Sequence, residues 1–79
     1  MTLKKQNLVE KDLAALAKQF RKKAGKTRAQ AAREMEVAQP AIYYAEESPH
    51  LSFLKLRTRM IEAYSPYQVE GPVFHLKNK

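Results

Sequence analysis

Apolar residues in the first third of the chain recur at the spacing of an α-helix. They stand three or four residues apart, at Val9, Leu13, Leu16, Phe20 and Ala24. This spacing places the side chains on one face of a helix. Asn7 followed by Glu10 resembles a capping box, and Gly25 is a natural helix stop. The pattern therefore predicts a helix over residues 8–24.

Two short helices separated by a turn are predicted next. Thr27 is a good N-cap, and residues 28–35 are rich in helix-compatible Ala, Gln, Arg and Glu. The three residues 36–38 are too few for a free loop, so a further helix begins at Gln39, with Pro40 tolerated in its first turn. The inward positions of this helix are Ile42 and Ala45. The positions that point outward or sideways are Gln39, Ala41, Tyr43 and Tyr44.

A fourth helix and a β-prone tail complete the pattern. Ser52 can cap a helix that ends before Pro66, with apolar residues again three and four positions apart. These are Phe53, Leu56, Met60 and Tyr64. Residues 67–76 are β-prone and are interrupted at Gly71, which predicts two short strands around a turn. The expected fold class is mainly α, with four compact helices and a short C-terminal β strand or hairpin.

The net charge of +7 lies in the first third of the chain. Residues 1–28 hold nine Lys and Arg against two acidic residues, whereas residues 29–79 hold six of each sign. A basic face attracts polyanions, because each neutralised phosphate releases condensed counterions. A solvated lysine face on an ordinary helix has the same composition, so charge alone leaves both interpretations open. Residues 1–6 are expected to form a flexible basic arm, whose Lys4 and Lys5 follow a nucleic-acid backbone, enter the minor groove or form a disordered end.

Composition argues against several kinds of site. Cys is absent, which excludes disulfides, thiolate zinc sites and thiol nucleophiles. The two histidines, His50 and His75, stand far apart, and two glycines are too few for a phosphate-cradling loop. The longest apolar run is five residues, 13–17, too short for a membrane-spanning helix or the core of a signal peptide. We therefore expect a cytoplasmic protein that is not an enzyme and has no metal, cofactor, membrane partner or small-molecule substrate.

Residues 27–46 form a motif of known kind. They read TRAQAAREMEVAQPAIYYAE, a short helix, a turn and a second short helix, which describes a helix-turn-helix. The segment resembles the Cro/cI phage-repressor family of the xenobiotic-response-element type. The positions held in common are Thr27, Ala32, Val37, Gln39, Ile42 and Glu46. The resemblance implies a compact four-helix lambda-repressor-like DNA-binding domain over residues 7–64, with an ion pair between Arg21 and Glu46.

Four positions depart from the family pattern. Glu36 stands where the family usually has Gly, at a position that tends to need φ > 0. Ala38 replaces the usual Ser or Thr N-cap of the third helix. Arg28 replaces a Gln that usually touches phosphate, and Ala31 replaces a core Leu. A further side chain is therefore needed to fill the gap beside Ala31.

The resemblance and the side-chain chemistry together nominate the site residues. Major-groove base contacts are expected from Gln39, Pro40, Ala41 and Tyr44. Phosphate contacts are expected from Lys26, Thr27, Arg28, Tyr43, His50 and Lys55. Gln pairs bidentately with adenine N6/N7, and an Ala methyl can touch the methyl group of thymine. The alternatives are a solvated Gln39, a neutral filler at Ala41, one tyrosine packed inward, and His50 as an exposed loop residue.

The expected function is sequence-specific binding of double-stranded DNA by a Cro-like transcriptional repressor. The helix over about residues 39–46 would read a pseudo-palindromic operator, and a homodimer would place two such helices about 34 Å apart. Residues 65–79 are the expected dimerisation segment, through Tyr67, Val69, Val73, Phe74 and Leu76. Three alternatives stay open: an antitoxin that represses its own toxin–antitoxin operon, a small basic RNA-binding protein, and a non-catalytic adaptor that binds protein.

Overall fold

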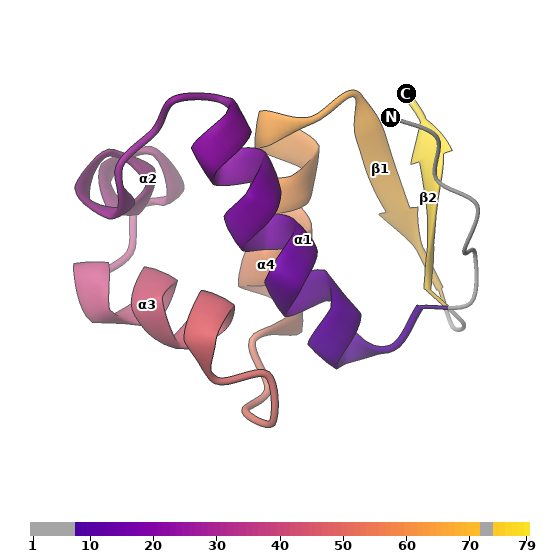
Figure 1. Ribbon diagram of the computed structural model, residues 1–79, viewed down its shortest axis with the longest axis horizontal. Coiled ribbons are helices and arrows are strands. Elements are labelled where there is room, and N and C mark those ends of the chain that lie inside the picture. The colour runs from indigo at the N-terminus through magenta and orange to yellow at the C-terminus, as the bar shows by residue number, and fades with distance from the viewer. Residues whose placement is uncertain (1–7, 72–73) are drawn as a thin grey trace.

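The computed structural model of the chain describes residues 8–71 and 74–79. Along the described chain come α1 (Glu10–Lys23), α2 (Arg28–Met35), α3 (Gln39–Glu47), α4 (Leu54–Tyr64), β1 (Tyr67–Glu70) and β2 (His75–Asn78). The expected fold class, mainly helical with a short C-terminal hairpin, is confirmed. α1 and α4 pack together in the middle, with α2 and α3 at one end and the hairpin at the other (Figure 1). The expected basic arm, with Lys4 and Lys5, lies outside the described residues.

α1 begins two residues later than its apolar spacing predicts. The N–H of Leu8 donates to the carbonyl of Phe74 at 2.7 Å in an antiparallel bridge, so the chain is still extended at this point. At the next residue, the N-cap, the N–H donates to the carboxylate of Asp12 at 3.0 Å. The expected capping box is therefore wrong, because Glu10 is the first helical residue and its carboxylate is used elsewhere. Asn7 lies outside the described residues.

The turn between α2 and α3 has the geometry that the sequence indicates. Thr27 and Gln30 form a reciprocal capping box at the start of α2. The C-cap of α2 is Glu36, whose φ of 59° lies in the left-handed region, as expected from the sequence at this position. Ala38 is the N-cap of α3 and provides no side-chain cap, and Pro40 lies in the first turn. α2 and α3 thus form a helix-turn-helix unit.

α4 begins at Leu54, one residue later than a cap by Ser52 would place its start. The N-cap is Phe53, which provides no side-chain cap, and its own N–H donates to the Glu10 carboxylate at 3.0 Å. The expected cap by Ser52 is therefore wrong, since this residue lies one position too early. The predicted end of the helix is confirmed, and there the Ser65 hydroxyl donates to the Ile61 carbonyl at 2.5 Å.

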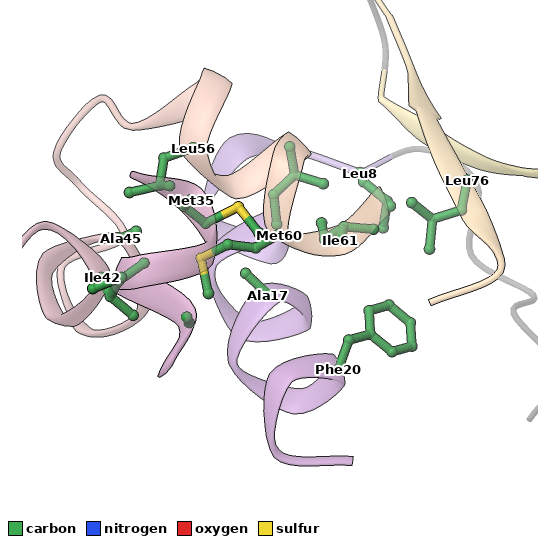
Figure 2. Packing of buried hydrophobic residues seen from close by; sticks show 13 residues of the cluster. Leu8, Ala17, Phe20, Met35, Ile42, Ala45, Leu56, Met60, Ile61 and Leu76 are labelled. Atoms are coloured by element: carbon green, nitrogen blue, oxygen red, sulfur yellow. The ribbon is translucent and has the colours of Figure 1, made fainter. Parts of the chain in front are cut away.

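One apolar core joins the four helices and the hairpin. Its largest fully buried apolar side chains are Leu13, Ile42, Met60 and Ile61. Ala31, at the position where the similar family has a core Leu, is also fully buried. Figure 2 shows the side chains of Met35 and Met60 pointing into the middle of the cluster. Flexible thioethers fill irregular gaps, and both methionines belong to the same buried cluster as Ala31.

The hairpin lies against the core of its own chain. β1 and β2 are antiparallel, with Val69 opposite Leu76. Four of the side chains expected at a dimer interface pack on this core: Tyr67, Val69, Phe74 and Leu76. The Tyr67 ring lies 6.0 Å from that of Phe20 in α1, so the hairpin covers an apolar face that the helices leave open. An interface made of these side chains would require the hairpin to leave the core; Val73 lies outside the described residues.

Candidate nucleic-acid interface

α3 buries one face and leaves the opposite face open to solvent. Ile42 and Ala45 on the inner face are fully buried. The exposed side chains of the outer face are Gln39, Pro40, Tyr43 and Tyr44. Tyr43 is 48% exposed and Tyr44 is 45% exposed, so the alternative that one tyrosine packs inward is wrong. Their rings meet edge to face with centroids 5.5 Å apart, which makes them one continuous aromatic surface.

An open surface hollow gathers five of the side chains expected to contact DNA. It is lined by Arg28, Gln39, Pro40, Tyr43 and Tyr44. Ala41 lies apart from them, because it is half-buried against the core and lines a separate groove with Val37 and Phe53. Ala41 therefore does not share the surface that the other expected base contacts form.

The ion pair between Arg21 and Glu46 is present and fixes α3 against α1. Arg21 Nε donates to Glu46 Oε2 at 2.5 Å, and Arg21 Nη2 donates to Glu46 Oε1 at 3.0 Å. Arg21 Nη1 also donates to the carbonyl of Lys26 at 2.7 Å. Both charged groups are buried, so removal of either partner would leave an uncompensated charge. The pair holds the end of α1, the following loop and α3 in one arrangement.

Arg28, an expected phosphate contact, is already bound by carboxylates of α3. Its Nε donates to Glu46 Oε1 at 3.1 Å, and its Nη2 donates to Glu47 Oε2 at 2.7 Å. Its guanidinium also lies over the Tyr43 ring, 5.1 Å from the centroid. Glu46 and Glu47 are consecutive at the end of α3, so one guanidinium reaches both carboxylates. The guanidinium is thereby fixed beside the hollow instead of extending freely into solvent.

Glu47 also binds a lysine of α1. Lys18 Nζ donates to Glu47 Oε2 at 2.5 Å. This hydrogen bond, followed by the charges of Lys18 and Arg28, lowers the pKa of Glu47 below its ordinary value. The carboxylate therefore stays ionised at neutral pH and neutralises part of the basic surface beside α3.

Lys26 and Thr27, two further expected phosphate contacts, have structural partners. Lys26 Nζ donates to Glu34 Oε2 at 2.8 Å, and the Tyr64 hydroxyl donates to the other oxygen of Glu34 at 2.6 Å. These two hydrogen bonds lower the pKa of Glu34, while burial and the same carboxylate raise the pKa of Tyr64. The Thr27 hydroxyl accepts the N–H of Gln30 at 3.1 Å. Both side chains lie at the start of α2, where backbone N–H groups also face solvent.

The segment between α3 and α4 carries the last two expected phosphate contacts. His50 and Lys55 are exposed, the first in the loop and the second in the first turn of α4. Both lie in the segment that follows the C-terminal end of α3, whereas Arg28 and Lys26 flank the start of α2. The expected phosphate contacts therefore come from segments on both sides of α3 in the chain.

Arg57 holds this loop in place from inside the protein. Its guanidinium is fully buried and donates to the carbonyls of Ala45 (2.8 Å), Ser48 (2.9 Å) and Leu51 (2.8 Å). Arg57 Nη1 also donates to Glu10 Oε2 at 2.5 Å. Burial lowers the pKa of Arg57, and the Glu10 carboxylate partly offsets this. The geometry of the loop thus depends on a charge that the apolar spacing of α4 does not reveal.

Comparisons of the chain with known proteins found no match. No protein-family model, curated protein or solved structure matches it. Within residues 8–71 and 74–79, no helix has the length and apolar character needed to cross a membrane. In the same part of the chain, no three His, Cys, Asp or Glu side chains gather as a metal site requires.

Proposed function

We propose that the chain is a sequence-specific regulator of transcription that binds double-stranded DNA as a Cro-like repressor. The observation that carries this proposal is the two-faced burial of α3. Ile42 and Ala45 anchor the helix, while Gln39 and the two tyrosines face solvent at one end of the molecule. An α-helix of about 10–12 Å diameter fits the B-DNA major groove, which is about 12 Å wide. The resemblance of residues 27–46 to the Cro/cI family agrees with this geometry.

In this proposal the side chains of Gln39 and Tyr44 read bases and the surrounding residues bind phosphates. The Gln39 amide has a donor and an acceptor, the pair that adenine N6/N7 requires, and the Tyr44 hydroxyl reaches a neighbouring base edge. The backbone N–H groups at the start of α2, together with Lys26, contact one phosphate group. His50 and Lys55 contact the DNA strand beyond α3.

The proposed active form is a homodimer on a pseudo-palindromic operator. Two α3 helices then enter successive major grooves about 34 Å apart, and each half-site adds to the affinity. A protein that occupies a promoter in this way represses transcription by excluding the polymerase. The proposed setting is the cytoplasm of a bacterium or a phage-infected cell.

Selection of bound duplexes from a random pool tests the proposal. The purified full-length chain is expected to enrich one sequence, and Gln39→Ala is expected to weaken base preference at one position per half-site by about 1–3 kcal/mol. Its matched control is Gln68→Ala, which changes the same amide on the hairpin at the far end of the molecule. The control is expected to enrich the same sequence as the original chain.

Two results would overturn the proposal. One is the failure of the full-length chain to enrich any sequence, whereas equal loss of binding to all sequences in Gln39→Ala would only reassign Gln39 from a base contact to a phosphate contact. The other is tighter binding to RNA than to duplex DNA of the same sequence, which would favour the RNA-binding alternative.

A further inference from the structure

The outer face of α3 has an unusual set of side chains for a helix that reads DNA. We infer that α3 reads A·T base pairs, through one amide and an apolar surface of proline and tyrosine that contacts thymine methyl groups. This inference rests on the proposed function and specifies the class of operator. The side chains concerned are Gln39, Pro40, Tyr43 and Tyr44, which line the hollow together with Arg28.

The first argument is the absence of cations along the helix. α3, which is described throughout, reads QPAIYYAEE and contains no Lys or Arg. Recognition of guanine O6/N7 in the major groove depends chiefly on Arg or Lys. Gln39 carries the only side-chain amide in α3, and amides match the acceptor and donor of adenine N7/N6. The hydrogen-bonding chemistry of the helix therefore favours adenine over guanine.

The second argument is that the guanidinium in the hollow is already engaged. Arg28 directs Nε toward Glu46 at 3.1 Å and Nη2 toward Glu47 at 2.7 Å. A bidentate contact with guanine would have to break charge-assisted hydrogen bonds to both carboxylates. Arg28 therefore does not replace the cation that α3 lacks.

The third argument concerns the acidic residues, which could otherwise accept a hydrogen bond from cytosine N4. The Glu46 carboxylate is fully buried and bound by two arginines. The Glu47 carboxylate is bound by Lys18 and Arg28. With both carboxylates occupied, the tyrosine hydroxyls are the polar groups of α3 that remain besides Gln39, and a hydroxyl both donates and accepts, so it does not select G·C over A·T.

The fourth argument is the apolar surface that remains. Pro40 has no backbone N–H, and the rings of Tyr43 and Tyr44 form one edge-to-face surface beside it. The C5-methyl of thymine is the apolar group that a base pair presents in the major groove. This surface is therefore suited to thymine methyls on either side of the adenine that Gln39 contacts.

Replacement of thymine by deoxyuridine in the selected operator tests the inference, because it removes only the methyl group. At each thymine under α3 the affinity is expected to fall about fourfold, the loss expected for one buried methyl. The same replacement at thymines outside the half-sites is the control and is expected to change nothing. Gln39→Arg is expected to change the preferred base at its own position from adenine to guanine.

The outcomes separate this inference from the proposed function. Specific binding to a half-site rich in G·C, or unchanged affinity after every deoxyuridine replacement, would overturn the A·T assignment and leave the DNA-binding proposal standing. Absence of any sequence preference in the full-length chain would overturn both.

Discussion

The guanidinium of Arg57 connects three backbone carbonyls to one carboxylate inside the protein. Two of the carbonyls, those of Ser48 and Leu51, belong to the loop after α3. The carboxylate, that of Glu10, also accepts the N–H of Phe53. One residue thus fixes the end of α3, the following loop and the start of α4 against α1.

Arg57→Leu is expected to destabilise the protein by about 3–5 kcal/mol, because it leaves the three carbonyls without their donor and the Glu10 carboxylate without its opposite charge. Urea unfolding followed by circular dichroism measures this loss. Lys55→Leu, at an exposed position of the same helix, is the control and should change stability by no more than about 0.5 kcal/mol. A loss below about 1 kcal/mol in Arg57→Leu would contradict the role assigned to this network.

The ion pair between Lys18 and Glu47 is expected to make stability depend on pH. The folded state lowers the pKa of Glu47, so the unfolded state binds its proton more tightly. The resulting stabilisation is complete above the ordinary carboxylate pKa of 4.5 and is lost as the pH falls through the lowered value. Glu34, lowered by Lys26 and Tyr64, adds a contribution of the same sign.

The urea concentration at the midpoint of unfolding is expected to fall as the pH is lowered from about 7 to about 3. The fall is expected to be smaller in Glu47→Gln. Lys18→Met removes the other partner and is expected to reduce the pH dependence in the same way. Equal falls in the original chain and in both variants would mean that this pair contributes nothing to the acid response.

At the scale of elements, one residue in the turn between α2 and α3 has a strained backbone conformation that a substitution can relieve. Glu36 adopts a φ of 59°, a conformation that costs a side-chain-bearing residue about 1–2 kcal/mol. Glu36→Gly is therefore expected to stabilise the protein by about 1 kcal/mol, which raises the melting temperature of a domain this size by about 4–8 °C.

Gly25 also has a positive φ, and here the opposite substitution, from glycine to a residue with a side chain, is expected to destabilise the protein. Its φ is +75° and no atom lies within 4 Å of an added Cβ, so Gly25→Ala introduces backbone strain without a steric clash. This variant is expected to lose about 1 kcal/mol. A stabilised Gly25→Ala or a destabilised Glu36→Gly would show that positive φ does not control stability at these two turns.

The elements differ in how far the sequence alone predicts them. The number, order and type of the helices follow from local apolar spacing, and the strain at Glu36 follows from the resemblance. The start of α1 does not, because it depends on the pairing of Leu8 with Phe74, at the far end of the chain. The burial of Arg57 is equally hidden, since nothing local distinguishes it from the exposed Arg59 two residues later.

In the candidate site too, some features could be predicted from the sequence and others depend on long-range packing. The outward face of α3 and the pair between Arg21 and Glu46 could be anticipated, since one follows from helical period and the other from the resemblance. The capture of Arg28 by two carboxylates could not, because the contact depends on how α2 packs against the end of α3. Long-range contacts of this kind are set by the packing of whole helices.

At the scale of the whole molecule, the hairpin and α3 lie at opposite ends of the 30 Å long axis (Figure 1). A straight dimer joined at the hairpins would hold its two α3 helices farther apart than the ~34 Å of one DNA turn. The two protomers of the proposed dimer must therefore be inclined to each other, so that both α3 helices reach the DNA at this spacing. The outer face of the hairpin is polar and charged, with Gln68, Glu70, His75 and Lys77 on it, so its edges are better suited to pairing than its face.

The two edges of the hairpin are not equivalent. On β1, the outward N–H groups of Tyr67 and Val69 already donate to Ser65 Oγ (3.2 Å) and Glu62 Oε2 (3.1 Å). On β2, the Lys79 N–H donates to Pro66 across the hairpin, so the N–H of the preceding residue, Asn78, points away from β1. The edge of β2 already holds Leu8 at Phe74, through the 2.7 Å hydrogen bond to the Phe74 carbonyl. The stretch from Leu76 to Asn78 is therefore the part of this edge that we propose for pairing with a second copy.

Asn78→Pro is expected to weaken the dimer, because proline removes this outward N–H while the hydrogen bonds between β1 and β2 are kept. Sedimentation equilibrium of the full chain should show a larger monomer fraction with unchanged helical content. Asn78→Ala keeps the N–H and should dimerise as the original chain does. Because two linked α3 helices bind an operator more tightly than one, Asn78→Pro should also lose affinity for the full operator while half-site binding stays the same. An unchanged dimer fraction in Asn78→Pro would exclude the edge of β2 as the interface.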